Sequence, residues 1–145
     1  MIAVMIVAVS MILAVALFLA GIEIQVMGIR NAVKAELASL SIKISDDTYQ
    51  SLREGDFEAY RDKLNSSSSY ISALTSDFYS SLEENIKLHT ETYDIENVSL
   101  AFTNAGNSLV YTFNCDVRFR VTILGGAFPE ITRSVTIEGR HNAKY

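Results

Sequence analysis

The chain has 145 residues, of which 49% are apolar, and a formal net charge of −5 at pH 7. This length fits one small domain plus one additional segment. From Ser45 onward, nine Lys and Arg residues stand against fifteen Asp and Glu residues. This acidity argues against a nucleic-acid partner, which would need a basic stripe. Cys115 is the only cysteine, so the chain forms neither an intramolecular disulfide nor a cysteine-based zinc motif.

The first 22 residues, Met1 to Ile22, carry no charged side chain, and Ser10 is their only polar one. As a helix with a rise of about 1.5 Å per residue, they span about 33 Å, close to the roughly 30 Å hydrocarbon core of a bilayer. A secretory signal peptide would show a basic n-region and a small-residue cleavage site, and this segment shows neither. We therefore expect residues 1–22 to lie in lipid or in another apolar environment.

The apolar segment continues without a proline into a segment that contains charged residues. Apolar positions there recur at steps of three or four, which is helical spacing: Ile22, Val26, Ile29, Val33, Leu37, Leu40 and Ile44. The pattern predicts one long helix over 1–44, about 65 Å in length. Its residues 1–22 are expected to form a transmembrane segment, and its residues 23–44 an amphipathic stalk.

Small residues recur along one side of this predicted helix. We call them the small-residue seam: Ala3, Ser10, Ala14, Gly21, Gly28, Ala32, Ala35 and Ser39. Small side chains let helix backbones approach closely in membranes. Each glycine costs about 0.5–1 kcal/mol relative to alanine in a helix, which favours a role in packing or local bending. The alternative is that Ala and Gly are simply common in membrane helices.

Residues 45–145 are expected to form a soluble head that contains helices within 46–88. Ser45 is predicted to begin a short helix that Gly55 interrupts, and Asp56 is predicted to cap a second short helix over 57–64. A polar loop over 65–69 then precedes a third helix over about 70–88. The third helix has one apolar stripe: Ile71, Leu74, Phe78, Leu82 and Ile86.

From Ile95 the apolar period changes to two, which predicts a sheet over 95–139. The first strand places Val98, Leu100 and Phe102 on one face, and residues 104–107 are a turn signal. The second strand has one apolar face: Leu109, Tyr111, Phe113, Cys115, Val117, Phe119, Val121 and Ile123. Residues 125–129 turn the chain into a third strand with Ile131, Val135 and Ile137. The predicted fold is α+β, with a three-stranded antiparallel sheet packed on the long helix.

Residue types that support catalysis or metal binding are few. His89 and His141 stand in no metal-ligand spacing, and the thiol of Cys115 lies on the apolar face of a strand, where it is expected to be buried and inert. A set of acidic residues and a histidine is expected to form a solvated surface: Glu83, Glu84, His89, Glu91 and Asp94. We expect no enzymatic activity, no cofactor and no metal site.

Two segments match the acceptor sequence for an N-linked glycan. These are Asn65-Ser66-Ser67 and Asn97-Val98-Ser99. The serine run over 66–69 is a candidate for O-linked sugar. Chance occurrence is the alternative in a chain rich in Asn and Ser.

In its order of parts, the whole chain resembles a mature type IV pilin. An uncharged N-terminal helix, an amphipathic continuation and a C-terminal antiparallel sheet carry this resemblance. The last strand, Ile131 to Gly139 after a Phe-Pro turn, is most similar to TadE/TadF-like pilins of tight-adherence systems. Met5 stands where many bacterial pilins carry a glutamate, which removes the carboxylate of the usual salt bridge to a neighbour's N-terminal amine. This departure leaves room for an atypical bacterial or an archaeal filament.

The resemblance implies that a prepilin peptidase removes a leader before Met1. It further implies that a pilus assembly platform moves the chain from the membrane into an extracellular filament of identical subunits. Met1, Ala3, Met5 and the small-residue seam would then lie in the filament core. The alternative is a single-pass, membrane-anchored binding module, an adhesin or minor pseudopilin, that does not itself form the filament.

Overall fold

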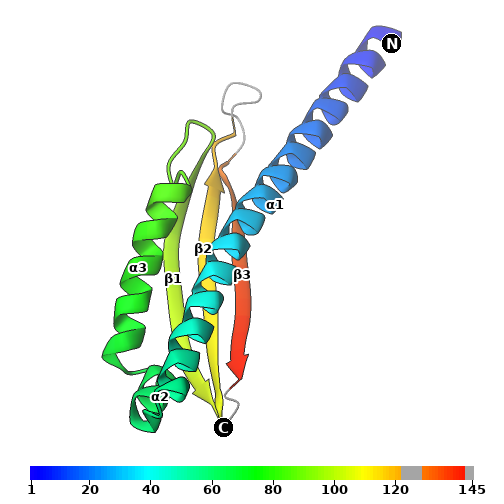
Figure 1. The fold of residues 1–145 in the computed structure, drawn as a ribbon. Coiled ribbons are helices and arrows are strands. Elements are labelled where there is room, and N and C mark those ends of the chain that lie inside the picture. Colours follow the sequence, from blue (N-terminus) through cyan, green and yellow to red (C-terminus); the bar gives the residue numbers. More distant parts are fainter. Residues whose placement is uncertain (122–128, 143–145) are drawn as a thin grey trace.

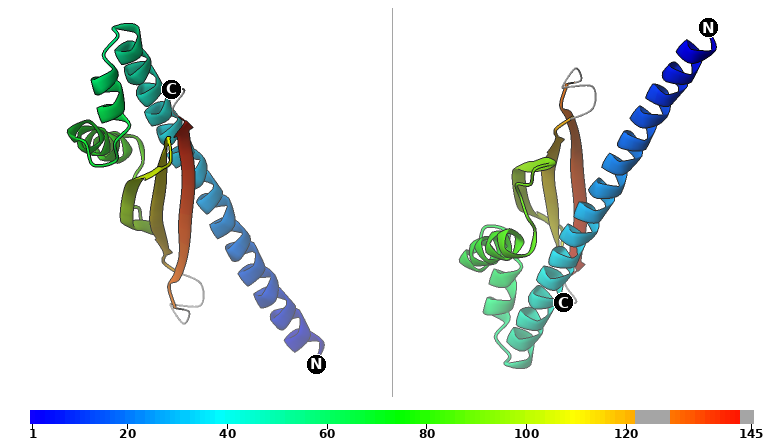
Figure 2. Two further views of the ribbon diagram at one scale, coloured as in Figure 1. Left: turned by 90° about the horizontal axis from the view of Figure 1, so that it is seen from below. Right: turned by 90° about the horizontal axis from the view of Figure 1, so that it is seen from above.

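The computed structural model describes residues 1–121 and 129–142. The described residues form three helices, α1 (Ile2–Arg53), α2 (Phe57–Lys63) and α3 (Ser69–Asn85), followed by three strands, β1 (Tyr93–Ala105), β2 (Ser108–Phe119) and β3 (Ile131–Asn142). The N-terminal half of α1 projects beyond the sheet, and its C-terminal half crosses the sheet obliquely (Figures 1 and 2). The predicted α+β layout is confirmed.

α1 ends at Arg53, so the predicted helix start at Ser45 is wrong. Its buried stripe continues past Ile44 through Thr48 and Ser51. The hydroxyl of Thr48 donates to the carbonyl oxygen of Ile44 at 2.7 Å, and that of Ser51 donates to the carbonyl oxygen of Asp47 at 3.2 Å. Both polar groups are thus satisfied within the helix. Residues 45–53 contain no Gly or Pro that would break the helix. The helix therefore continues, and the polar residues that resembled a helix start lie in its interior.

The predicted helix break at Gly55 is confirmed, but the helix that ends there is α1 and not a separate short helix. The φ of Gly55 is +74°, a left-handed conformation that glycine adopts without strain. The Gly55 N–H donates to the carbonyl oxygen of Leu52, and the Asp56 N–H donates to that of Ser51, which is the Schellman pattern of a helix C-terminus. The Asp56 side chain then accepts a hydrogen bond from the Ala59 N–H at 2.9 Å and caps α2.

α3 confirms the predicted third helix, with a shorter C-terminal end. The side chain of Ser68 accepts a hydrogen bond from the Ile71 N–H at 3.3 Å and caps its start. The helix ends at Asn85 because Ile86 takes an extended backbone conformation, with φ −123° and ψ 127°. The Ile86 side chain is nevertheless buried, so the whole predicted apolar stripe faces the core.

The sheet has the strand order β1-β2-β3, and both strand pairs are antiparallel, as predicted. Val135 and Ile137 of β3 are buried. The predicted apolar face of β2 is buried from its first residue to its last: Leu109, Tyr111, Phe113, Cys115, Val117 and Phe119. Of the remaining predicted positions, Val121 lies beyond the end of β2, and Ile123 and the turn over 125–128 lie outside the described residues.

A β-bulge in β1 departs from the simple alternation that the sequence predicted. Asn97 and Val98 together lie opposite the single residue Cys115 of β2, and Asn97 has a positive φ of 53°. The extra residue places both Ile95 and Leu100 on the buried face, although they are five positions apart. Strict alternation would put these two side chains on opposite faces.

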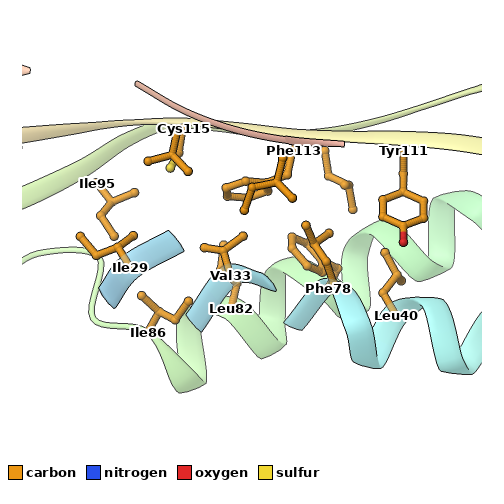
Figure 3. Packing of buried hydrophobic residues seen from close by; sticks show 14 of the residues in the cluster. Ile29, Val33, Leu40, Phe78, Leu82, Ile86, Ile95, Tyr111, Phe113 and Cys115 are labelled. Carbon is orange, nitrogen blue, oxygen red and sulfur yellow. The ribbon is translucent and has the colours of Figure 1, made fainter. Parts of the chain in front are cut away.

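Side chains from α1 and α3 together cover the apolar face of the sheet (Figure 3). Val33 of α1 and Leu82 of α3 are almost fully buried opposite Phe113 at the middle of β2. The ring of Phe78 packs edge to face on that of Phe113, with ring centroids 5.9 Å apart. One stripe of α1 is therefore committed to the core of the head.

We expect Gly139→Ala to destabilise the head. Gly139 pairs with Tyr111 across β2 and β3, and an added Cβ atom would overlap the Tyr111 ring. Displacing this buried ring costs about 1–2 kcal/mol, measured by chemical unfolding of the detergent-solubilised chain. The matched control is Gly28→Ala, where an added Cβ has no atom within 4 Å; it should raise the stability by up to about 1 kcal/mol. Equal effects of the two substitutions would contradict this assignment.

Candidate functional site

The N-terminal half of α1 exposes an apolar surface on all sides. α1 is long and apolar enough to cross a membrane, and none of its most apolar 18-residue window is buried against the rest of the protein. Phe18 is half-buried, and Ile22, 4% exposed, is the first buried residue of the helix. α1 is therefore a candidate membrane span whose free part ends where its contact with the head begins.

The head is fixed along the second half of α1. In addition to the buried stripe, Arg133 of β3 donates from Nε to the carboxylate of Glu23 at 3.0 Å. Ser81 and Asn85 of α3 donate to the two carboxylate oxygens of Glu36, at 2.7 and 3.0 Å. Elements from both sides of the head thus hold α1, and the head is packed on the helix along this length.

The face of α1 that points away from the head carries a second uncharged row. Its residues recur at alternating steps of four and three, and all are exposed: Ile24, Gly28, Asn31, Ala35, Ala38 and Ile42. We call them the outer row. At 3.6 residues per turn, it lies nearly opposite the buried stripe. Ile24 and Ile42, the large side chains of the row, are 69% and 62% exposed.

The outer row continues the apolar N-terminal half of the helix. The same alternating steps extend back through uncharged residues: Gly21, Leu17, Ala14, Ser10, Val7 and Ala3. Charged side chains of the stalk, such as Arg30, Lys34 and Lys43, flank this row and do not interrupt it. A repeat of this spacing is the pattern with which helices pack along one another. The head covers the apolar stripe that the sequence predicted from Ile22 to Ile44, with Val26 half-buried, and leaves the outer row exposed.

The positions of the small-residue seam differ in exposure. Ala3, Ser10 and Ala14 are exposed on the projecting half, together with Met1 and Met5, and Gly21 is half-buried where the head begins. On the stalk, Gly28, Ala35 and Ser39 are exposed, whereas Ala32 is half-buried against the core of the head. The seam is therefore open to a neighbour at all positions except Ala32 and, in part, Gly21.

Neither glycine of α1 is required by the packing of the head. A Cβ atom added at Gly21 or at Gly28 would have no atom within 4 Å. Each glycine nevertheless lowers the intrinsic stability of the helix. The reason for a glycine at these positions is therefore not found within the described part of the chain.

A charged cluster closes the end of the head that faces the projecting half of α1. Asp94, whose side chain is 8% exposed, accepts from His89 Nδ1 at 3.0 Å, from Arg118 Nη2 at 3.4 Å and from Arg120 Nη2. Arg120 Nη1 also donates to the carbonyl oxygens of residues 90 and 91. These contacts, the hydrogen bond with His89 first, lower the pKa of Asp94. The cluster ties the connection between α3 and β1 to the end of β2.

This cluster corrects one expectation from the sequence. The sequence predicts a solvated surface for Asp94 and His89; His89 is exposed, whereas Asp94 is buried and paired with cations. Glu83, Glu84 and Glu91 are exposed, as expected. Among the described residues, no group of three or more His, Cys, Asp and Glu side chains is arranged to hold a metal ion.

The expected sugar acceptors Asn65 and Asn97 are both exposed, in different surroundings. Asn65 lies in the connection between α2 and α3, whereas Asn97 lies at the bulge of β1. Asn97 Nδ2 donates to Asp116 at 2.9 Å, and this hydrogen bond lowers the pKa of Asp116.

We expect Asp94→Asn to lower the melting temperature at pH 7. The pKa of Asp94 is lowered in the folded state, so its ionisation stabilises the fold above the unfolded-state pKa of about 3.9, and this contribution is lost as the pH falls below that value. The difference in melting temperature between wild type and variant should therefore be present at pH 5–7 and shrink towards pH 2. The exposed Glu83→Gln serves as the control. A constant difference across this range would contradict the assigned role.

The Cys115 thiol is expected to be unreactive in the folded protein. It is 2% exposed, and its burial, followed by the charge of Asp116, raises its pKa to about 11. Since the thiolate is the nucleophile, alkylation at pH 8 should require opening of the sheet and should accelerate at least a hundredfold in denaturant. Mass spectrometry after timed iodoacetamide exposure measures this rate. Rapid labelling of the folded chain would show that the thiol is accessible.

Comparisons of the chain with family models, with curated proteins and with solved structures found no match. The structure itself establishes the α+β layout, with a membrane-length apolar helix ahead of a three-stranded antiparallel sheet. The resemblance to type IV pilins therefore depends on the order of these parts and enters below as a proposal.

Proposed function

We propose that this protein is a structural, non-enzymatic subunit of an extracellular, type IV pilus-like filament. In this proposal the α1 helices of identical copies bundle in the filament core, and the heads form the outer shell. The observation that supports it best is the outer row of α1, which remains uncharged and uncovered from Ile24 to Ile42. A helix that served only as an anchor would need its apolar surface only within the bilayer. The outer row continues about 27 Å beyond the projecting segment.

In this proposal the apolar surface of α1 is buried first in the membrane and later in the filament. Before assembly, the bilayer solvates the projecting half of α1. Once the chain leaves the membrane, the same side chains must be buried elsewhere, because each Å² of exposed apolar surface costs about 25 cal/mol in water. Neighbouring α1 helices supply a surface of matching length and chemistry.

The small residues of the outer row fit this packing. Gly28 and Ala35 have little or no side chain that protrudes from the helix, so the backbone of a neighbouring helix could approach closely. Neither residue has a packing partner in the head that requires a small side chain, and Gly28 has open space around it. Contacts between different faces of successive copies build an open helical polymer when the rotation between copies does not close a ring, and the filament proposal requires this case.

In this proposal the chain lies in the membrane before it enters the filament. The prepilin peptidase and assembly platform that the resemblance implies would act on the projecting half of α1, which the head leaves free. The rival function is a membrane-anchored binding module, whose α1 stays in lipid and whose outer row contacts a different protein. The two functions differ in what the outer row contacts.

We expect Gly28→Leu and Ala14→Leu each to reduce filament yield at least tenfold, because a large side chain separates neighbouring backbones along the row. Electron microscopy of filaments sheared from cells that produce the protein, with mass spectrometry of that fraction, measures the yield. Gly28→Ala is the matched control and should assemble normally. Circular dichroism should show a folded head in all three variants.

Two outcomes would contradict the proposal in different ways. Normal yields from both leucine variants would remove the role of the outer row in assembly. A wild-type chain that remains in the membrane pellet and is absent from the sheared filaments would favour the anchored binding module.

A further inference from the structure

We propose that the folded head accepts an N-linked glycan at Asn65 and not at Asn97, although both stand in Asn-x-Ser sequons. The two sequons differ in two respects in the structure: the hydrogen bonds of the carboxamide and the attachment of the sequon to the fold. This inference does not rest on the filament proposal.

The carboxamide of Asn65 is held by its oxygen, and its nitrogen is left available. Asn65 Oδ1 accepts a hydrogen bond from the N–H of Ser67, the hydroxyl residue of the sequon, at 3.1 Å. Asn65 Nδ2 donates to no residue in the described part of the chain. A sugar attached to this nitrogen would therefore displace no hydrogen bond among the residues that the structure describes.

The chain on both sides of Asn65 is fixed by a single residue of β1. Asn104 Nδ2 donates to the carbonyl oxygen of Leu64 at 2.6 Å, and Asn104 Oδ1 accepts from the Ser66 N–H at 2.8 Å. These two hydrogen bonds hold the residues before and after Asn65 against the sheet. Asn65 is thereby kept at the surface of a short, fixed connection.

An open hollow of about 560 Å³ lies beside Asn65 and gives a glycan space. Arg61, Asn104 and Asn107 line it with guanidinium and amide groups, which can donate to or accept from sugar hydroxyls. Its volume falls in the range of about 300–1,000 Å³ that small-molecule sites occupy. The first sugars of a glycan on Asn65 would lie at the rim of this hollow.

The carboxamide and the sequon of Asn97 are held by different contacts. Its Nδ2 donates to Asp116 Oδ2 at 2.9 Å. The middle residue of its sequon, Val98, packs against the core, and Ser99 pairs with Asn114 in the β1–β2 ladder. A transferase could bind this sequon only after part of β1 had been pulled out of the sheet.

The transfer needs one co-reactant, an oligosaccharide linked to a polyprenyl diphosphate. A bond forms between Asn65 Nδ2 and the anomeric carbon of the first sugar. The bond between that carbon and a diphosphate oxygen breaks, and the oxygen leaves with the electron pair. The amide nitrogen releases one proton, and nothing is oxidised or reduced.

The location of Asn65 is compatible with assembly of the chain. α2 and the turn between β1 and β2 lie at the end of the head away from the projecting half of α1 (Figure 1). A glycan there would leave the outer row uncovered. Glycosylation and helix packing are thus separable, and the test below measures the first without the second.

The experiment incubates the folded, full-length chain in detergent with an oligosaccharyltransferase that recognises Asn-x-Ser and with a polyprenyl-diphosphate-linked oligosaccharide. Peptide mass spectrometry then measures the occupancy of each asparagine. We expect at least tenfold higher occupancy at Asn65 than at Asn97. Synthetic peptides spanning 61–70 and 93–102 are the controls and should be modified to similar extents, because only the fold separates the two sequons.

Matched variants complete the test. Asn65→Gln should abolish modification of the folded chain, and Asn97→Gln should leave it unchanged. Comparable occupancy of Asn97 in the folded chain would overturn the proposal. So would an unmodified Asn65 in the folded chain, whatever the peptides accept, or sugar found only on the serine hydroxyls over 66–69.

Discussion

The packing of one stripe of α1 on the apolar face of the sheet determines most of what this structure can do. The stripe begins at Ile22 and continues to Ser51, and with α3 it covers the buried side of β2. Because the head covers only this side of the helix, the opposite side stays exposed along its whole length. Because the contact begins only at the end of the uncharged segment, the first part of α1 remains available to lipid or to other helices.

The polar contacts of the head serve this packing and do not compete with it. Glu23 and Glu36 are bonded by β3 and α3 at the two margins of the stripe. At the end of the head nearest the projecting helix, Asp94 joins the α3–β1 connection to β2 through two arginines and a histidine. These three carboxylates thus fix segments of the head and α1 to one another, and the outer row carries no charge.

Much of the fold could be predicted because it depends on local rules. The alternation along β2, the stripe of α3 and the stop at Gly55 all follow from side-chain period and backbone preference. The continuation of α1 past Ser45 could not be predicted, because polar residues such as Ser45 and Thr48 occur both at helix starts and within helices. Burial against distant residues decides between the two, and Thr48 bonds within the helix. The bulge at Asn97 has no sequence signal of its own, since it follows from the register against β2.

The candidate sites show the same division between local and distant information. The buried stripe of the stalk follows from the predicted apolar positions, and the packed head leaves the outer row on the opposite face uncovered. Likewise, both sequons match the same acceptor pattern, and distant residues make them differ: Asp116 accepts from Asn97, whereas Asn104 holds Leu64 and Ser66 on either side of Asn65. As for mechanics, α1 is a single helix of 52 residues, about 78 Å long, that continues from the projecting segment into the head. Tension on the head would therefore be transmitted directly to the helix backbone. It would act as shear on the side-chain contacts along the buried stripe, because α1 has no break between the projecting segment and the head.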